Sequence, residues 1–311
     1  MHHTPNYLVS IIKLLALLFA LFAFAANSVL CRMALGEDNI DAASFTIIRL
    51  LSGAAILFLM VQFLNKPEKP QHLTLRPLKQ KRLWIAPLML FMYAVLFSFA
   101  YLELTTATGA LVLFVTVQIT MVAYQVYKGN SLTGFEWFGL IIALFGFLVL
   151  LLPTAQRPSI IGLLLMIGSG IAWAIYTIEG KQSETPLRDT AENFIGSIPM
   201  VLGLMVITVW FAELSWKGVG LAVISGAFAS GVGYALWYLA LPRLSMASAA
   251  VSQLSVPLIA AVGGVWLVGE SLSLQLILAT IFIIGGIFVV SLGKPNVDSA
   301  ENKIKTASDS V

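Results

Sequence analysis

Two charged side chains lie within or beside apolar runs of the sequence, where a charge is costly unless it has a partner. Arg49 lies inside the run 43–64, and Glu103 lies near the end of the run 83–104. If both runs are membrane helices, Glu103 lies at the outer end of its helix, and Arg49 lies about six residues, or roughly 9 Å, below the outer end of its own helix. An ion pair there would form a gate, or a counter-ion for a zwitterionic solute. The alternative is that Arg49 reaches lipid headgroups and Glu103 lies in water.

Two glutamines are uncharged candidates for contact with a solute. Gln253 precedes Pro257 by four residues, so both lie on one helical face, and a proline there frees a backbone carbonyl. Gln118 lies at nearly the matching depth in the earlier half of the chain. We expect the two glutamines to line a pathway. The alternative is helix packing through hydrogen bonds worth about 0.6 kcal/mol each.

Aromatic residues recur at helical spacing in two further stretches. Tyr234 and Trp237 lie three residues apart behind the glycine-rich SGVG, and Trp173 and Tyr176 repeat the spacing. Such stripes are more often packing surfaces than binding sites. An aromatic wall around a few polar anchors is also what an apolar or aromatic solute requires, so all four are candidate substrate-binding residues.

Other chemistries lack the residues that they need. Cys31 is the only cysteine and histidine occurs only at positions 2, 3 and 72, so we expect no metal site, no intrachain disulfide and no cofactor. Neither a nucleophile with its base nor a glycine-rich phosphate loop is present, which argues against an enzyme and against ATP hydrolysis. Basic residues are confined to short loops and the C-terminal tail, so the net charge of +3 indicates orientation and no nucleic-acid partner. Glu103 is the best remaining proton carrier, since no acidic residue or histidine lies at a clear midplane position.

The elements that hold these residues are long apolar runs. Hydrophobic residues make up 59% of the 311-residue chain and charged residues 11%, which leaves too little polar surface for a soluble globule. The runs are continuous, as membrane helices require, rather than alternating as in barrel strands. We predict an all-α integral membrane protein with ten transmembrane helices, although the first run could pass for a secretory signal. The predicted spans are residues 7–34, 43–64, 83–104, 106–127, 135–152, 160–178, 190–211, 219–241, 246–268 and 272–292.

The chain contains an internal repeat. Residues 105–152 align with 245–292 without a gap, and the turn GNSLT aligns with GESLS. Five spans per copy is an odd number, so the second copy must enter the membrane from the opposite side. The sequence thus predicts two inverted five-helix repeats, 7–153 and 158–293, followed by a disordered cytoplasmic tail, 294–311. The aligned pairs include Gly129 with Gly269 and Gly146 with Gly286.

Positive charges in the loops predict the orientation. The connection 65–82 carries six lysine or arginine residues, and such loops stay in the cytoplasm. With an even number of spans, both termini are then cytoplasmic. We expect a multi-pass protein of a bacterial-type inner (plasma) membrane.

Several segments carry a family resemblance. They include NSVLCRMAL, ASFTIIRLLSGA, GIAWAIYTIEGK and SVPLIAAVGGVWLVGESLS, in which Pro257 precedes Glu270 by thirteen residues. These segments resemble the drug/metabolite transporter (DMT) superfamily, in particular its EamA-domain family. The resemblance covers residues 14–292 and implies ten helices in two inverted EamA repeats that move small molecules. The first copy departs from the pattern, with Val117 at the position of Pro257 and Asn130 at that of Glu270.

We therefore expect a secondary transporter that moves a small metabolite, amino-acid-like or drug-like, across the inner membrane by alternating access, in the direction of export. A receptor or structural protein that does not move a solute is the alternative, and a membrane enzyme is the more remote one. The expected partners are a small-molecule substrate and the lipid bilayer, and homodimer formation is left open.

Overall fold

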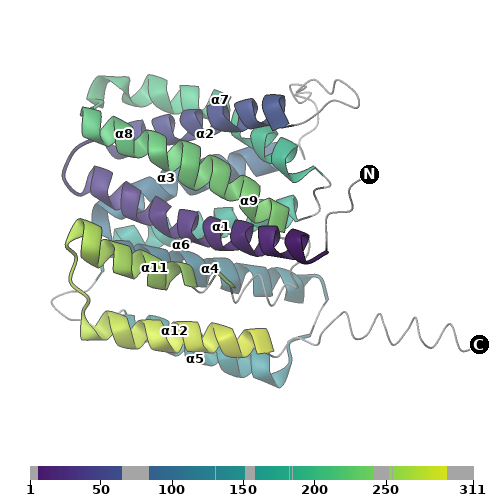
Figure 1. Ribbon diagram of the computed structural model, residues 1–311. Helices are drawn as coiled ribbons and strands as arrows, with labels where there is room; N and C mark the ends of the chain where they lie inside the picture. The colour runs from purple at the N-terminus through teal and green to yellow at the C-terminus, as the bar shows by residue number, and fades with distance from the viewer. Residues whose placement is uncertain are drawn as a thin grey trace, which may run out of the picture.

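The computed structural model is helical over nearly all of the part that it describes. It describes residues 6–64, 84–129, 131–150, 158–181, 183, 185–240, 252–253 and 255–292. Within these residues, one isolated antiparallel bridge joins Ile40 to Leu214. Figure 1 shows the helices lying side by side along a common direction. They are α1 (Asn6–Leu35), α2 (Ala42–Leu64), α3 (Ile85–Glu103), α4 (Thr106–Tyr127), α5 (Gly134–Leu150), α6 (Ile160–Gly180), α7 (Pro186–Thr208), η2 (Val209–Phe211), α8 (Trp216–Ile224), η3 (Ser225–Val232), α9 (Gly233–Ala240), α11 (Ser255–Gly263), η5 (Gly264–Val268) and α12 (Leu274–Leu292).

Apolar composition accounts for these helices. Within the described ranges, seven helical segments are long and apolar enough to cross a membrane, and three shorter apolar segments accompany them. Each predicted span overlaps one of these segments, so the prediction of an all-helical membrane protein is confirmed. Ten crossings stay a prediction, and residues 246–251 and 254 of the ninth predicted span lie outside the described part.

Local sequence signals set helix ends that the apolar runs alone misplaced. α7 begins at Pro186, four residues before the predicted start, because proline is favoured in the first helical turn and Asp189 complements the helix dipole there. α8 begins at Trp216, because the hydroxyl of Ser215 accepts a hydrogen bond from the next turn. α1 extends to Leu35, one residue beyond the predicted span, and Arg32 lies in its last turn, where a cation stabilises the carbonyl end of a helix.

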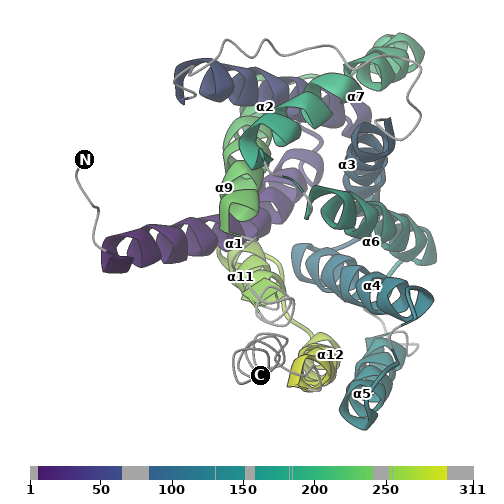
Figure 2. The same cartoon turned by 90° about the vertical axis from the view of Figure 1, so that its right-hand side faces the viewer.

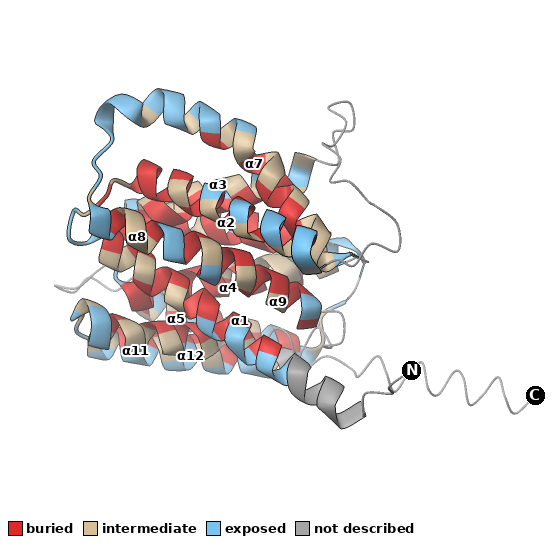
Figure 3. Ribbon diagram, turned by 45° about the horizontal axis from the view of Figure 1, so that its top comes forward, coloured by how far each residue is buried: buried red, intermediate tan, exposed pale blue. Residues whose placement is uncertain are grey.

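The surface and the chain ends fit a membrane bundle. α1 begins and α12 finishes at the same end of the bundle, on the right-hand side of Figure 1. Bulky apolar side chains remain exposed on the outer helices, and the pale blue segments of Figure 3 mark exposed residues on α7 and α12. Phe63, Ile161 and Trp266 are examples. Such a surface suits lipid and would aggregate in water.

The two copies of the repeat share a turn geometry. Gly129 and Gly269, which the alignment pairs, adopt positive φ angles of 91° and 75°. This left-handed conformation ends a helix and favours glycine, because a Cβ would clash with the backbone. The paired glycines therefore have a common structural cause, which a chance match of apolar sequences would lack.

α5 and α12 pack against each other with the symmetry of the repeat. A Cβ on Gly139 would collide with the carbonyl oxygen of Gly286, and one on Gly146 would lie 2.9 Å from that of Ala279. Adding the alignment offset of 140 residues converts Gly139 to Ala279 and Gly146 to Gly286, so each contact maps onto the other. The two helices run antiparallel, and a two-fold axis that exchanges antiparallel helices is perpendicular to both, as inverted repeats require. Figure 2 shows the pair at one edge of the bundle, far from α2 and α7.

Candidate functional site

Arg49 lies on α2 and is buried inside the bundle, with 1% of its surface exposed. Its Nε donates a hydrogen bond to Oγ of Ser230 at 3.0 Å. Its Nη2 donates to the hydroxyl oxygens of Tyr93 at 2.9 Å and Tyr234 at 3.2 Å. Its Nη1 is buried and has no hydrogen-bond partner in the described part of the chain. The guanidinium therefore keeps part of its donor capacity free.

Close backbone packing positions these partners. A Cβ on Gly226 would collide with the carbonyl oxygen of Arg49, so η3 and α2 approach as closely as two backbones can. η3 is π-helical, a conformation that often occurs at functional sites. Ser230 within η3 and Tyr234 just after it thereby reach the guanidinium.

Aromatic rings from α3 surround the guanidinium. Its Cζ lies 5.1 Å from the ring centre of Tyr93 and 4.9 Å from that of Phe97. Such cation–π contacts contribute about 2 kcal/mol each when desolvated. A buried cation without a counter-charge costs at least several kcal/mol, so the rings offset only part of the penalty. Among the described residues, no carboxylate forms an ion pair with Arg49.

The four aromatic residues predicted from the sequence lie in one cluster around Phe24 of α1. The ring centre of Phe24 lies 5.7 Å from those of Trp173 and Tyr234, and 5.6 Å from that of Trp237. Trp173 also contacts Tyr234 at 4.7 Å and Tyr176 at 5.4 Å. The cluster joins α1 of the first repeat to α6 and α9 of the second, and Tyr234 connects it to Arg49.

A small cavity lies between these rings, with a volume of about 10 Å³. This volume holds about one water molecule, so a solute must move the surrounding helices to enter. Asn27 of α1 forms part of the wall. Its Nδ2 donates to the hydroxyl of Tyr93 at 3.2 Å, and its Oδ1 accepts from Ser225 Oγ at 2.6 Å. The site is therefore contracted and closed in this conformation.

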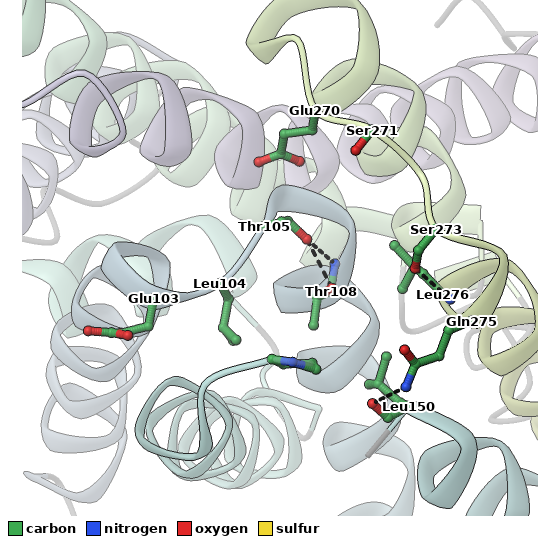
Figure 4. A pocket seen from close by; sticks show the side chains of 11 residues that line it. Glu103, Leu104, Thr105, Thr108, Leu150, Glu270, Ser271, Ser273, Gln275 and Leu276 are labelled. Atoms are coloured by element: carbon green, nitrogen blue, oxygen red, sulfur yellow. Dashed lines mark hydrogen bonds between the residues drawn. The ribbon is translucent and has the colours of Figure 1, made fainter. Parts of the chain in front are cut away.

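The structure does not bring Arg49 and Glu103 together. Tyr93 and Phe97 lie four residues apart on the face of α3 that meets Arg49, whereas Glu103 ends the helix on another face. Glu103 lies instead at a separate cavity of about 310 Å³, which Glu270 and residues of α12 also line (Figure 4). The predicted ion pair is not formed in this conformation.

The two candidate glutamines are buried, and the hydrogen bonds around Arg49 and Asn27 do not include them. Gln118 on α4 is 7% exposed, and Gln253 is 2% exposed. Gln118 Nε2 and Gln253 Oε1 have no hydrogen-bond partner among the described residues. A buried amide without a partner costs free energy, which keeps both residues candidates for contact with a solute in another conformation. Their role stays a prediction.

Asn27, Tyr93 and Ser230 complete the site, although they are not among the sequence-based candidates. Each is a polar group inside an apolar run, which is the signal that identified Arg49. An ion pair between Arg32 and Glu270 was also not foreseen, and their Nε and Oε1 atoms lie 3.3 Å apart.

The chain is similar to known membrane proteins along nearly its whole length. A model of the EamA-like transporter family matches residues 11–152 and 160–292. Uncharacterized protein PA1977 of Pseudomonas aeruginosa is 41% identical over 277 residues, which cover 89% of this chain and 93% of that protein. Uncharacterized transporter YwfM of Bacillus subtilis is 25% identical over 308 residues, which cover 96% of this chain and 97% of that protein. Threonine/homoserine exporter RhtA of Escherichia coli K12 is 27% identical over 59% of this chain and 61% of its own.

A solved crystal structure has a similar fold. Its chain superposes with a TM-score of 0.62 at 18% identity, over 89% of this chain and 96% of that chain. At that identity the likeness concerns the fold alone.

Proposed function

Because the chain belongs to the EamA-like transporter family, we propose that it is a secondary transporter that exports a small, carboxylate-bearing metabolite. The proposed mechanism is alternating access, in which two inverted repeats, 7–153 and 158–293, expose one central site to each side of the membrane in turn. Membership in a transporter family supports a function in solute transport and not in catalysis. The contracted site between the two repeats supports a cycle with a closed state.

The observation that carries this proposal is the buried guanidinium of Arg49. It has a free donor at Nη1 and no carboxylate partner among the described residues. A guanidinium holds a carboxylate through two parallel hydrogen bonds, which an ammonium group cannot do. A carboxylate on the solute would therefore supply the negative counter-charge that Arg49 lacks among the described residues.

The surroundings of Arg49 favour an amino-acid-like or drug-like solute with an apolar body. The rings of Phe24, Tyr93 and Trp173 offer apolar surface, and the amide of Asn27 can bond to a polar substituent. Gln118 and Gln253 are proposed to add polar contacts once the site opens. The relative RhtA is named as an exporter of threonine and homoserine, so neutral amino acids are the first solutes to test.

The proposed setting is a bacterial inner membrane with ten crossings and both termini in the cytoplasm. The positive charges of the connection 65–82 support this orientation. α1 begins and α12 finishes at one end of the bundle, in keeping with an even number of crossings. Export into the medium is the proposed direction.

Comparison of exported metabolites tests the proposal. Cells without the protein, cells with the wild-type protein and cells with Arg49→Gln at equal membrane levels are grown in parallel, and their media are compared by mass spectrometry. We expect one or a few carboxylate-bearing metabolites to accumulate outside only with the wild-type protein. The proposal fails if the wild-type protein changes no metabolite. If Arg49→Gln exported as much as the wild-type protein, transport would stand, and the proposed role of Arg49 in binding the solute carboxylate would be wrong.

A further inference from the structure

An ion pair joins the two repeats at the end of the bundle where α1 finishes. Arg32 Nε lies 3.3 Å from Glu270 Oε1, and Arg32 Nη1 donates to the carbonyl oxygen of Tyr101 at 2.9 Å. Both carboxylate oxygens of Glu270 accept from the backbone N–H of Thr106, at 3.0 and 2.9 Å. The side chains of Arg32 and Glu270 are 25% and 10% exposed, so the pair is partly buried.

Glu270 also caps a helix of the other repeat. Thr106 is the first residue of α4, where unpaired N–H groups and the helix dipole attract a negative charge. The left-handed Gly269 turns the chain so that the N–H of Glu270 donates to the carbonyl of Gly264 at 3.0 Å. A Cβ on Gly264 would lie 2.7 Å from Glu270 Oε2, so a side chain here would displace the carboxylate from its position at the start of α4.

Beneath the ion pair, side chains of α3 close the way to Arg49. The hydroxyl of Tyr101 donates to the carbonyl oxygen of Thr106 at 3.3 Å, and its ring packs edge-on against Phe97 at 4.8 Å. Phe97 in turn lies under the Arg49 guanidinium. Tyr101 is completely buried. A continuous stack of side chains therefore runs from the ion pair to the proposed solute site.

We infer that Arg32 and Glu270 form the outer gate of the transport cycle. Glu270 belongs to the second repeat, whereas Arg32, Tyr101 and Thr106 belong to the first. Separation of the repeats at this end must break the ion pair and remove the cap of α4. It would also remove the cover that the ion pair forms over Tyr101. This inference rests on the proposed alternating-access function.

The gate distinguishes one end of the molecule from the other. The alignment places Asn130 at the position of Glu270, and an amide has no charge with which to pair a cation. Asn130 lies outside the described residues, so this comparison is one of sequence alone. The charged contact between Arg32 and Glu270 favours the conformation that is closed at this end, which is the conformation seen here.

A second contact at the same end is too exposed to replace the gate. Lys217 donates a hydrogen bond to Glu37 and lowers the pKa of that carboxyl group. Both side chains are more than half exposed, and exposed ion pairs contribute little. The partly buried pair of Arg32 and Glu270 is the one whose loss should open the outer end.

Cys31 offers a direct readout of the gate. It is the only cysteine, directly precedes Arg32 and is completely buried. An impermeant maleimide added to intact cells should therefore reach Cys31 only when the outer end opens. We expect slow labelling of the wild-type protein and about tenfold faster labelling of Glu270→Gln and of Arg32→Gln, through a shift in the conformational equilibrium.

Two further variants sharpen the test. Gly264→Ala keeps every charge but displaces the carboxylate, so it should also speed the labelling of Cys31, and it carries the test if Glu270→Gln fails to reach the membrane. Glu213→Gln is the matched control, because residue 213 lies at the same end and bonds to Asp41 only through its backbone. Its labelling should equal that of the wild-type protein.

The gate is overturned if both Glu270→Gln and Gly264→Ala label at the wild-type rate, or if Glu213→Gln accelerates labelling as much as they do. Labelling requires no solute. If the wild-type protein moved no metabolite, the proposed function would be wrong, and the labelling rates of Cys31 would still test the gate.

Discussion

Arg49 combines a full charge, nearly complete burial and partners that are all neutral. Tyrosine and serine hydroxyls take three of its hydrogen bonds, and two rings lie against its guanidinium. These contacts hold the side chain in place without cancelling its charge. Such a site binds an anion more strongly than a site in which the arginine is already paired with a carboxylate of the protein, because no internal carboxylate competes with the solute.

Arg49→Lys tests whether the geometry of the guanidinium matters beyond its charge. Lysine keeps the positive charge but cannot hold a carboxylate through two parallel hydrogen bonds. We expect the half-saturating solute concentration for transport to rise about tenfold or more, since a charge-assisted hydrogen bond contributes about 1.5–3 kcal/mol. The measurement is solute uptake into vesicles of reconstituted protein. Arg188→Lys, at an ion pair with Glu192 near the start of α7, is the control and should leave transport unchanged.

Gln253→Leu tests whether that buried amide contacts the solute. Leucine suits an apolar interior, so the protein should still fold and reach the membrane. We expect altered transport kinetics, because Gln253 Oε1 has no partner within the described residues and is available to a solute. Transport indistinguishable from that of the wild-type protein would assign Gln253 to helix packing.

Single residues of this site differ in how far the sequence reveals them. The cost of polarity in lipid singles out Arg49 and Gln253 without a structure. The same rule applied to Asn27 and Ser230 would have found them too. The partner of Arg49 was not predictable, because Glu103 and Tyr93 lie about 15 Å apart along α3 and the sequence does not fix which level of that helix meets Arg49.

Helix pairs in this protein depend on glycine where two backbones touch. At the crossing of α5 and α12, a Cβ on Gly286 would lie 2.5 Å from Ala143 N, whereas a Cβ on the neighbouring Gly285 would meet nothing within 4 Å. Both positions are glycines on the same helix, and they differ only in what a Cβ would contact. They therefore offer a matched pair of substitutions.

Gly286→Ala should destabilise the folded protein by about 1–3 kcal/mol, the usual cost of overpacking. Gly285→Ala should be neutral or slightly stabilising, because alanine favours a helix more than glycine does. Thermal unfolding of the two variants in the same detergent provides the measurement. Equal midpoints would contradict the close contact between α5 and α12.

The helices themselves were largely predictable, because length and hydropathy determine which segments can cross a lipid bilayer. Their ends required finer signals, such as the Ser215 cap of α8 and the proline that starts α7. The π-helical turn η3 was beyond prediction. The sequence does not show that Gly226 of η3 packs directly against the backbone of α2.

The whole molecule is organised by its internal repeat. The alignment of the two copies is supported by the shared left-handed glycines and by the symmetric contacts of α5 with α12. The partly buried ion pair between Arg32 and Glu270 joins the repeats at one end of this scaffold and favours the conformation that is closed there. The orientation of that scaffold in the membrane follows only from the positive charges of the connection 65–82.

Cysteine labelling tests this orientation. Cysteines introduced at Gln71 and Ser299, in a Cys31→Ala background, should resist an impermeant reagent in intact cells, because both positions are expected in the cytoplasm. Trp216→Cys is the control and should label readily, since residue 216 is 93% exposed at the opposite end of the bundle. Labelling at Gln71 would reverse the proposed orientation.

Competition by a solute that lacks its carboxylate tests the central claim most directly. Wild-type protein in vesicles would be given the exported metabolite with an excess of the same molecule or of the derivative in which an uncharged carboxamide group replaces the carboxylate. The expected result is saturable uptake that the metabolite inhibits and the carboxamide does not, because only the carboxylate can pair with Arg49. Equal inhibition by both compounds would contradict the role of Arg49, and the absence of any saturable uptake would contradict transport itself.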